Sequence, residues 1–139
     1  MTVLYSAEMA GLAAVPVSLP SGGIVDGNVR VKRATITLAT QTTSDTIVIA
    51  KATEGESFLY GIVNTDTSLG SAQIAIGVSG TVAKYKAAAV QTATNAPAIF
   101  GVNAGTATVT ASEEIFITIS AANLPASGNL VVDMYFSAT

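Results

Sequence analysis

The chain lacks histidine, cysteine and tryptophan altogether, and only 11% of its 139 residues are charged. Histidine and cysteine supply many of the proton-transfer groups, nucleophiles and metal ligands that enzymes use near neutral pH. Without them the chain cannot form a Ser-His-Asp triad, a thiol nucleophile or a metal site built from those residues. The absence of cysteine also excludes disulfides. We therefore predict a protein that is not an enzyme and that has no catalytic residue, metal or cofactor.

Charge of either sign is scarce. Nine acidic and six basic residues give a formal net charge of −3 and a pI near 4.6. A nucleic-acid-binding domain normally carries a basic face, so we expect no direct contact with nucleic acid. The first basic residue is Arg30, which leaves no basic start for a signal peptide, and no uncharged apolar run reaches membrane-spanning length. We expect synthesis in the cytoplasm and no membrane association.

Hydrophobic residues, by contrast, make up half of the chain, and the mean hydropathy is +0.55. They occur in short runs rich in Val, Ile and Thr, which predict β-strands at residues 34–39, 46–50, 58–63, 72–78, 106–110, 115–119 and 130–136. Short strands at intervals of roughly ten residues favour a sandwich or a barrel. Residues 58–63 are expected to be buried on both faces. The high hydropathy also indicates apolar surface that a partner covers, most simply a second copy in a symmetric dimer.

Residues 81–90 do not fit a single interpretation. The segment is rich in alanine, and Val82, Tyr85 and Ala89 recur at helical spacing. The same residues could instead form a long connection or an irregular strand. Helix and non-helix therefore both remain open.

Residues 1–28 differ from the rest of the chain. Pro16, Pro20 and the pair Gly22-Gly23 are turn or coil formers, and the apolar residues around them follow no sustained period. A disordered terminus is one interpretation, but disordered segments are usually poor in apolar residues. We favour an extended N-terminal arm that lies on a partner, followed by one β-sandwich domain at residues 29–139.

Three of the six basic residues cluster where the arm enters the first strand, at Arg30, Lys32 and Arg33. An ordinary solvated strand start would have this composition. Alternatively, the cluster could anchor an acidic partner surface, because Arg suits interface ion pairs. Strand alternation would point Arg30 and Lys32 to one face and Arg33 to the other.

Lys84, Tyr85 and Lys86 form a second candidate contact. Tyr is favoured at interfaces because its ring buries area while its hydroxyl finds a partner, although it is also common at the edge of a core.

No catalytic or calcium-binding motif in the sequence is complete. Residues 77–80 read Gly-Val-Ser-Gly, one residue short of a nucleophile elbow, and the few carboxylates near Glu113 are too sparse for a calcium loop.

Four stretches of the chain resemble a known family. These are residues 58–61 (FLYG), 68–80 (SLGSAQIAIGVSG), 83–88 (AKYKAA) and 124–133 (LPASGNLVVD). They are similar to the capsid cement, or decoration, proteins of tailed bacteriophages of the podophage type. The resemblance covers about residues 30–139.

This resemblance implies a jelly-roll-like antiparallel β-sandwich on the outer surface of the icosahedral head of a virion. The family's proteins bridge major capsid subunits of the HK97 type and stabilise the shell against internal DNA pressure, and relatives form homodimers. One alternative is a carbohydrate- or receptor-binding β-sandwich module of a phage tail or bacterial surface, which would normally carry aromatic platforms. A β-sandwich hydrolase is a further alternative, and the missing histidine and cysteine oppose it.

Overall fold

The described part of the chain is an all-β structure. The computed structural model describes residues 16–17, 19, 28–101 and 108–138, and within them it has no helix. The strands are β1 (Asn28–Thr37), β2 (Thr46–Ala52), β3 (Ser57–Thr65), β4 (Gln73–Val78), β5 (Thr81–Val90), β6 (Ala98–Phe100), β7 (Glu113–Ser120) and β8 (Asn129–Ala138).

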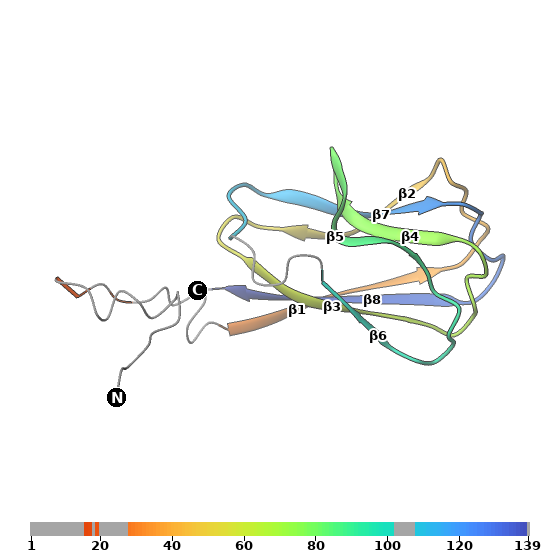
Figure 1. The fold of residues 1–139 in the computed structure, drawn as a ribbon, viewed down its shortest axis with the longest axis horizontal. Coiled ribbons are helices and arrows are strands. Elements are labelled where there is room, and N and C mark those ends of the chain that lie inside the picture. Colours follow the sequence, from red (N-terminus) through yellow and green to blue (C-terminus); the bar gives the residue numbers. More distant parts are fainter. Residues whose placement is uncertain (1–15, 18, 20–27, 102–107, 139) are drawn as a thin grey trace, which may run out of the picture.

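These strands form two four-stranded sheets, in the orders β1-β8-β3-β6 and β2-β7-β4-β5. Neighbouring strands are antiparallel throughout, and Figure 1 shows the two sheets as stacked layers. Apart from β4 and β5, consecutive strands alternate between the sheets, which is the double Greek-key arrangement of a jelly roll. The predicted jelly-roll-like sandwich is confirmed. Most of the predicted arm, residues 1–15, 18 and 20–27, lies outside the described residues.

Alternate residues of each strand fill the space between the sheets. In β7, Ile115, Ile117 and Ile119 point inward and are at most 1% exposed. The inward residues of β8 are fully buried: Leu130, Val132, Met134 and Phe136. Each such side chain contributes about 1.5–3 kcal/mol by leaving water, so the two-residue period of these strands fixes which face is inside.

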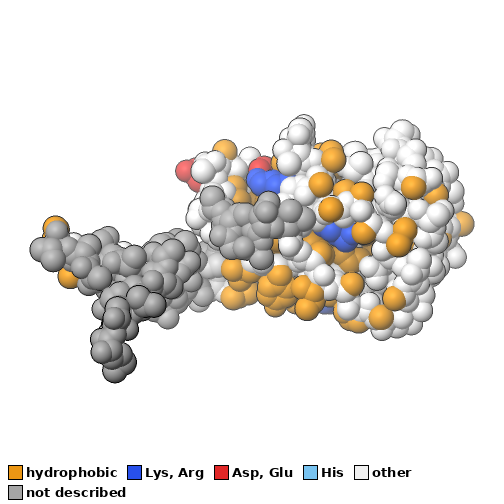
Figure 2. All heavy atoms as spheres, viewed as in Figure 1, with side chains coloured by type: hydrophobic (Ala, Val, Ile, Leu, Met, Phe, Trp, Pro, Cys, Tyr) orange, Lys and Arg blue, Asp and Glu red, His pale blue; other side chains and the backbone are white. Residues whose placement is uncertain are grey.

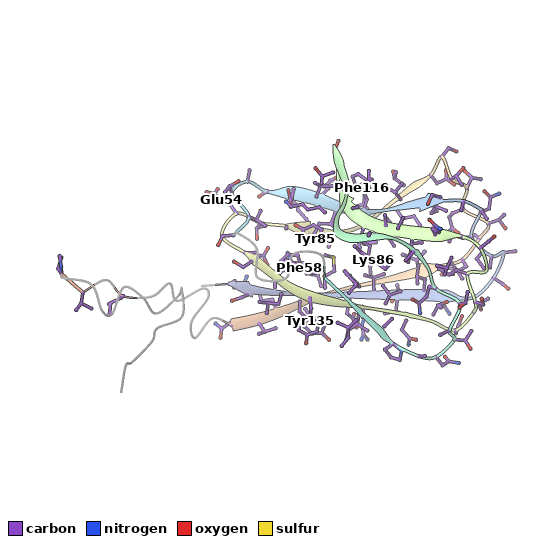
Figure 3. The ribbon with its side chains drawn as sticks, viewed as in Figure 1. Glu54, Phe58, Tyr85, Lys86, Phe116 and Tyr135 are labelled. Atoms are coloured by element: carbon purple, nitrogen blue, oxygen red, sulfur yellow. The ribbon has the colours of Figure 1, made fainter. Side chains whose placement is uncertain are left out.

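An aromatic cluster lies between the two sheets. The ring of Phe58 lies 4.8 Å from that of Tyr85 and 5.5 Å from that of Phe136, in both cases edge to face, and Figure 3 shows Phe58 and Tyr85 in the gap between the sheets. Phe100 stacks on Phe58 at 6.2 Å. Gly61 leaves room for it, because a Cβ at that position would overlap the Phe100 ring.

Residues 81–90 form strand β5, so the helical interpretation is wrong. Gly80, at a φ of 82°, makes the turn between β4 and β5. The pairing then shifts register on both sides of Ile76, which breaks strict alternation along β5. Of the three residues at helical spacing only Tyr85 is buried, whereas Val82 and Ala89 are exposed, so the spacing does not mark a buried face.

Three further expectations need correction. Residues 58–63 are buried on one face only, since Tyr60 is 39% exposed and Leu59 and Ile62 are half-buried. The described part of the 106–110 segment, residues 108–110, is not a strand, although the Val109 N–H donates to the Glu56 carbonyl at 2.7 Å. β6 was not predicted, because three residues are too few to show a period.

The aromatic cluster predicts a large difference between two phenylalanine truncations. Phe136→Ala removes a fully buried ring and should lower the free energy of unfolding by about 3–5 kcal/mol. Phe116 in β7 is half-buried on the outward side, so Phe116→Ala should cost less than half as much. Urea unfolding of both variants and the parent measures the difference; equal losses would contradict this description of the core.

Candidate functional site

The basic cluster is divided by the alternation of β1. Lys32 points toward the interior edge, where its Nζ donates to Glu56 Oε1 at 2.8 Å and lies 4.9 Å from the centre of the Phe136 ring. Arg33 points to the opposite face and forms a bidentate pair with Asp133, at 2.7 and 2.8 Å. Arg30 is exposed and makes no ion pair with any residue that the structure describes.

Glu56 is the anchor of the Lys32 group. It is only 3% exposed and also accepts hydrogen bonds from the backbone N–H of Thr53, at 2.7 Å, and from the Thr53 hydroxyl. Burial alone would raise the pKa of Glu56, but the bonds from Lys32 and Thr53, with the charge of Lys32, outweigh it and lower this pKa below its ordinary value. Lys32 is therefore committed to the body of the protein.

The second candidate group lies on β5 and is also engaged internally. Tyr85 is 3% exposed, and its hydroxyl donates to Glu113 Oε1 at 2.6 Å. Lys84 Nζ donates to the same oxygen at 2.6 Å. Burial and the hydrogen bond to Glu113 raise the pKa of Tyr85. Tyr85 thus belongs to the core, the plainer of the two interpretations that its sequence context allows.

Lys86 is half-buried on the same strand. Its Nζ donates to the backbone carbonyls of Ile74, at 3.3 Å, and Ala87, at 3.2 Å. Burial lowers the pKa of Lys86. Of the six candidate contact residues, Arg30 is exposed without a partner among the described residues, and Arg33 is exposed but paired.

The outer face of the β1-β8-β3-β6 sheet is a feature that the sequence analysis missed. Val31 pairs with Tyr135, and Tyr135 with Tyr60; the two tyrosine rings stack at 4.7 Å. Beside this row, Arg33 and Asp133 border a hollow of about 300 Å³. Its other lining residues are Ile62, Asn64, Pro97 and Val131. The alternation of Val29 and Val31 with Arg30 and Lys32 was the available signal.

Neither a metal site nor a membrane-spanning element is found in the described residues. Within residues 28–101 and 108–138, no three His, Cys, Asp or Glu side chains are grouped so that they could hold a metal ion. No helix of the described chain is long and apolar enough to cross a membrane.

Comparison with known proteins gives a likeness in fold. No protein-family model matches the chain, and no curated protein matches it significantly in sequence. Among solved structures, a chain of the capsid asymmetric unit of cyanophage Pam1 is similar, with a TM-score of 0.66, 18% identity and coverage of 81% of this chain and 86% of that one. A chain of the capsid of Ralstonia phage GP4 has a TM-score of 0.64 at 14% identity, with the same coverage of both chains.

A third similar chain comes from the acid-stable capsid of Helicobacter pylori bacteriophage KHP30. Its TM-score is 0.59 at 9% identity, with 78% of this chain and 86% of that chain covered. The three matches establish that this sandwich has the same fold as chains found in those capsid structures.

The hydrogen bonds that Glu56 accepts from Lys32 and Thr53 predict a specific dependence of stability on pH. Because the pKa of Glu56 is lowered by folding, its stabilising effect is present above its ordinary pKa and is lost as the pH falls through the folded value. Glu56→Gln should therefore destabilise the protein near neutral pH, and the deficit should shrink as the pH falls from about 7 to about 3. Urea unfolding at a series of pH values measures it.

Glu54→Gln is the matched control, since Glu54 is exposed two residues away and forms no ion pair among the described residues; Figure 3 labels it at the end of the body. This variant should follow the parent at every pH. A deficit of Glu56→Gln that stays constant with pH would show that the carboxylate charge has no part in stability.

Proposed function

We propose that this chain is a decoration protein of a tailed-phage capsid, which binds the outer surface of the shell and bridges major capsid subunits of the HK97 type. The observation that carries the proposal is the likeness in fold, over about four-fifths of this chain and 86% of each matched chain, to three chains from phage capsid structures. Their similar coverage also means that the matched chains are about as long as this one.

The side chains of the described residues support a role in contact. The charged and hydroxyl groups around the aromatic cluster are bound to one another, so none of them is poised to take a proton from a substrate. The accessible groups of the described residues include the unpaired guanidinium of Arg30 and the apolar outer sheet face. Such groups bind other proteins.

Bridging would stabilise the shell by multiplying weak contacts. A copy that touches two capsid subunits must lose both contacts before it leaves, so its effective affinity exceeds that of either contact. A homodimer would double the number of contacts again. In this proposal the N-terminal arm, residues 1–28, supplies contact with the shell, and the sandwich supplies a stable body.

Removal of the arm is the central test. Deletion of residues 1–27 should leave a folded sandwich, because the buried core lies between Ile36 and Ala138, and should abolish most of the binding to capsids that lack the protein. Thermal unfolding and co-sedimentation with purified capsids of the parent phage measure the two effects. A truncated protein that fails to fold would place the arm in the core, and one that binds capsids as well as the full chain would refute the arm's role.

Arg30 offers a smaller, electrostatic test. Arg30→Ala should weaken capsid binding by no more than about fivefold, because an exposed ion pair is worth about 0–1 kcal/mol, and the effect should fade as salt is raised. Lys51→Ala removes the same charge from an exposed side chain on β2 and should not change binding. Co-sedimentation at low and high salt distinguishes them. Equal effects of both changes would remove Arg30 from the contact.

A further inference from the structure

The outer face of the β1-β8-β3-β6 sheet carries more apolar surface than a solvated sheet face requires. Antiparallel sheets usually present alternating polar residues to water. Here Val29, Val31 and Ile99 are 61%, 56% and 76% exposed, and Tyr60 is 39% exposed. The space-filling view in Figure 2 shows hydrophobic side chains gathered along the side of the body where this sheet lies.

The opposite sheet presents both polar and apolar side chains outward. The residues next to its inward isoleucines point outward, and they are mostly polar. Thr46 pairs with Thr118, and Gln73 with Ser120. Val48, Val82 and Val90 of the opposite sheet are also exposed, at 59%, 48% and 49%. What sets the outer face of β1-β8-β3-β6 apart is its stacked pair of tyrosines and its balanced charge.

Aromatic residues occupy the middle of the face. Tyr60 and Tyr135 stack with their planes 15° apart and their centroids at 4.7 Å, and Figure 3 shows Tyr135 on this sheet. Two tyrosines held against each other form a broad, rigid surface that loses little side-chain entropy on binding. Buried tyrosines of this kind often dominate the energy of an interface.

The face is electrically neutral. By strand register its outward charges are Arg33 and Asp133, and they form a bidentate pair with each other. A chain with a net charge of −3 repels its own copies at long range, so a neutral apolar face is where two copies can meet with the least repulsion. An acidic partner surface would gain nothing here, because the one cation is already neutralised.

The size of the face fits a pair of copies. The β1–β8 ladder runs for ten residues, or about 34 Å, and four strands about 4.8 Å apart span roughly 19 Å. Because β6 has only three residues, the usable area is about 500 Å² per copy. Two such faces bury about 1,000 Å² together, which is near the lower limit for a specific interface.

We propose that a second copy of this chain covers this face, forming a two-fold symmetric dimer in which Val31, Tyr60, Tyr135 and Ile99 are buried. The inference deepens the proposed function, since it names the surface that joins the two copies of the bridging unit. In a two-fold interface the same patch is used on both copies, so each substitution on it acts twice.

The test is a pair of matched charge insertions in the full chain. Val31→Glu places a carboxylate on the face at a position that is 56% exposed, and Val48→Glu does the same on β2 of the opposite sheet, at 59%. Val31→Glu should weaken dimerisation by at least about tenfold, because each copy then buries an unpaired charge. Val48→Glu should leave it unchanged. Sedimentation equilibrium across a concentration series measures the dissociation constants.

Ile99→Glu, on β6, is a second variant in case Val31→Glu disturbs the edge strand, and circular dichroism with thermal unfolding checks the fold of each. A parent protein that remains monomeric, or equal effects of Val31→Glu and Val48→Glu, would overturn the inference.

Capsid co-sedimentation of the same proteins separates the two proposals. A dimer that does not bind capsids keeps the inference and refutes the proposed function, whereas a monomer whose capsid binding is lost only in Val31→Glu makes this face the capsid contact instead.

Discussion

The rest of the structure depends on the cluster of aromatic rings between the two sheets. Phe58, Tyr85 and Phe136 bring large rings into the gap between the sheets, and the neighbouring residues bring charges to the same place. A charge beside apolar rings is tolerated only when it is paired and hydrogen-bonded. Glu56 and Glu113 meet this requirement by collecting Lys32, Lys84 and the Tyr85 hydroxyl. These two networks therefore engage Lys32, Lys84 and Tyr85, three of the six residues proposed as contacts from the sequence.

The local sequence pattern was sufficient to locate the strands whose apolar residues recur at every second position. In β7 burial alternates strictly, and in β8 the apolar residues Leu130, Val132, Met134 and Phe136 follow the same two-residue period, although Asp133 and Ser137, which lie outside this period, are also buried. Where pairing is irregular the pattern is ambiguous, as in β5, whose register shifts twice against β4. The order of the strands within the sheets was implied by family resemblance and not by periodicity, because the pairing partners of β1 and β8 are about a hundred residues apart.

The candidate contacts were harder to predict than the fold, for a related reason. Tyr85 finds its carboxylate partner 28 residues away and Arg33 finds its partner 100 residues away. Sequence neighbours do not indicate such pairs, so Arg33 and Lys84 could not be distinguished from free side chains. The apolar outer face was missed because only the basic residues of the segment 29–33 were considered, and not Val29 and Val31 between them. Once β1 is known to begin at Asn28, its alternation separates the two sets.

The position of β1 links the proposed interface to the proposed contact with a shell. β1 is an edge strand of its sheet, and the chain enters it at Asn28, next to the exposed Val29. If two copies meet through this face, the segments that precede Asn28 begin beside the dimer interface and are related by its two-fold axis. Each could then reach a different capsid subunit. The loss of one contact would leave the other to hold the pair in place, so that individually weak interactions give slow dissociation. A stable body, a neutral apolar face and little reactive chemistry are what such a mechanism requires.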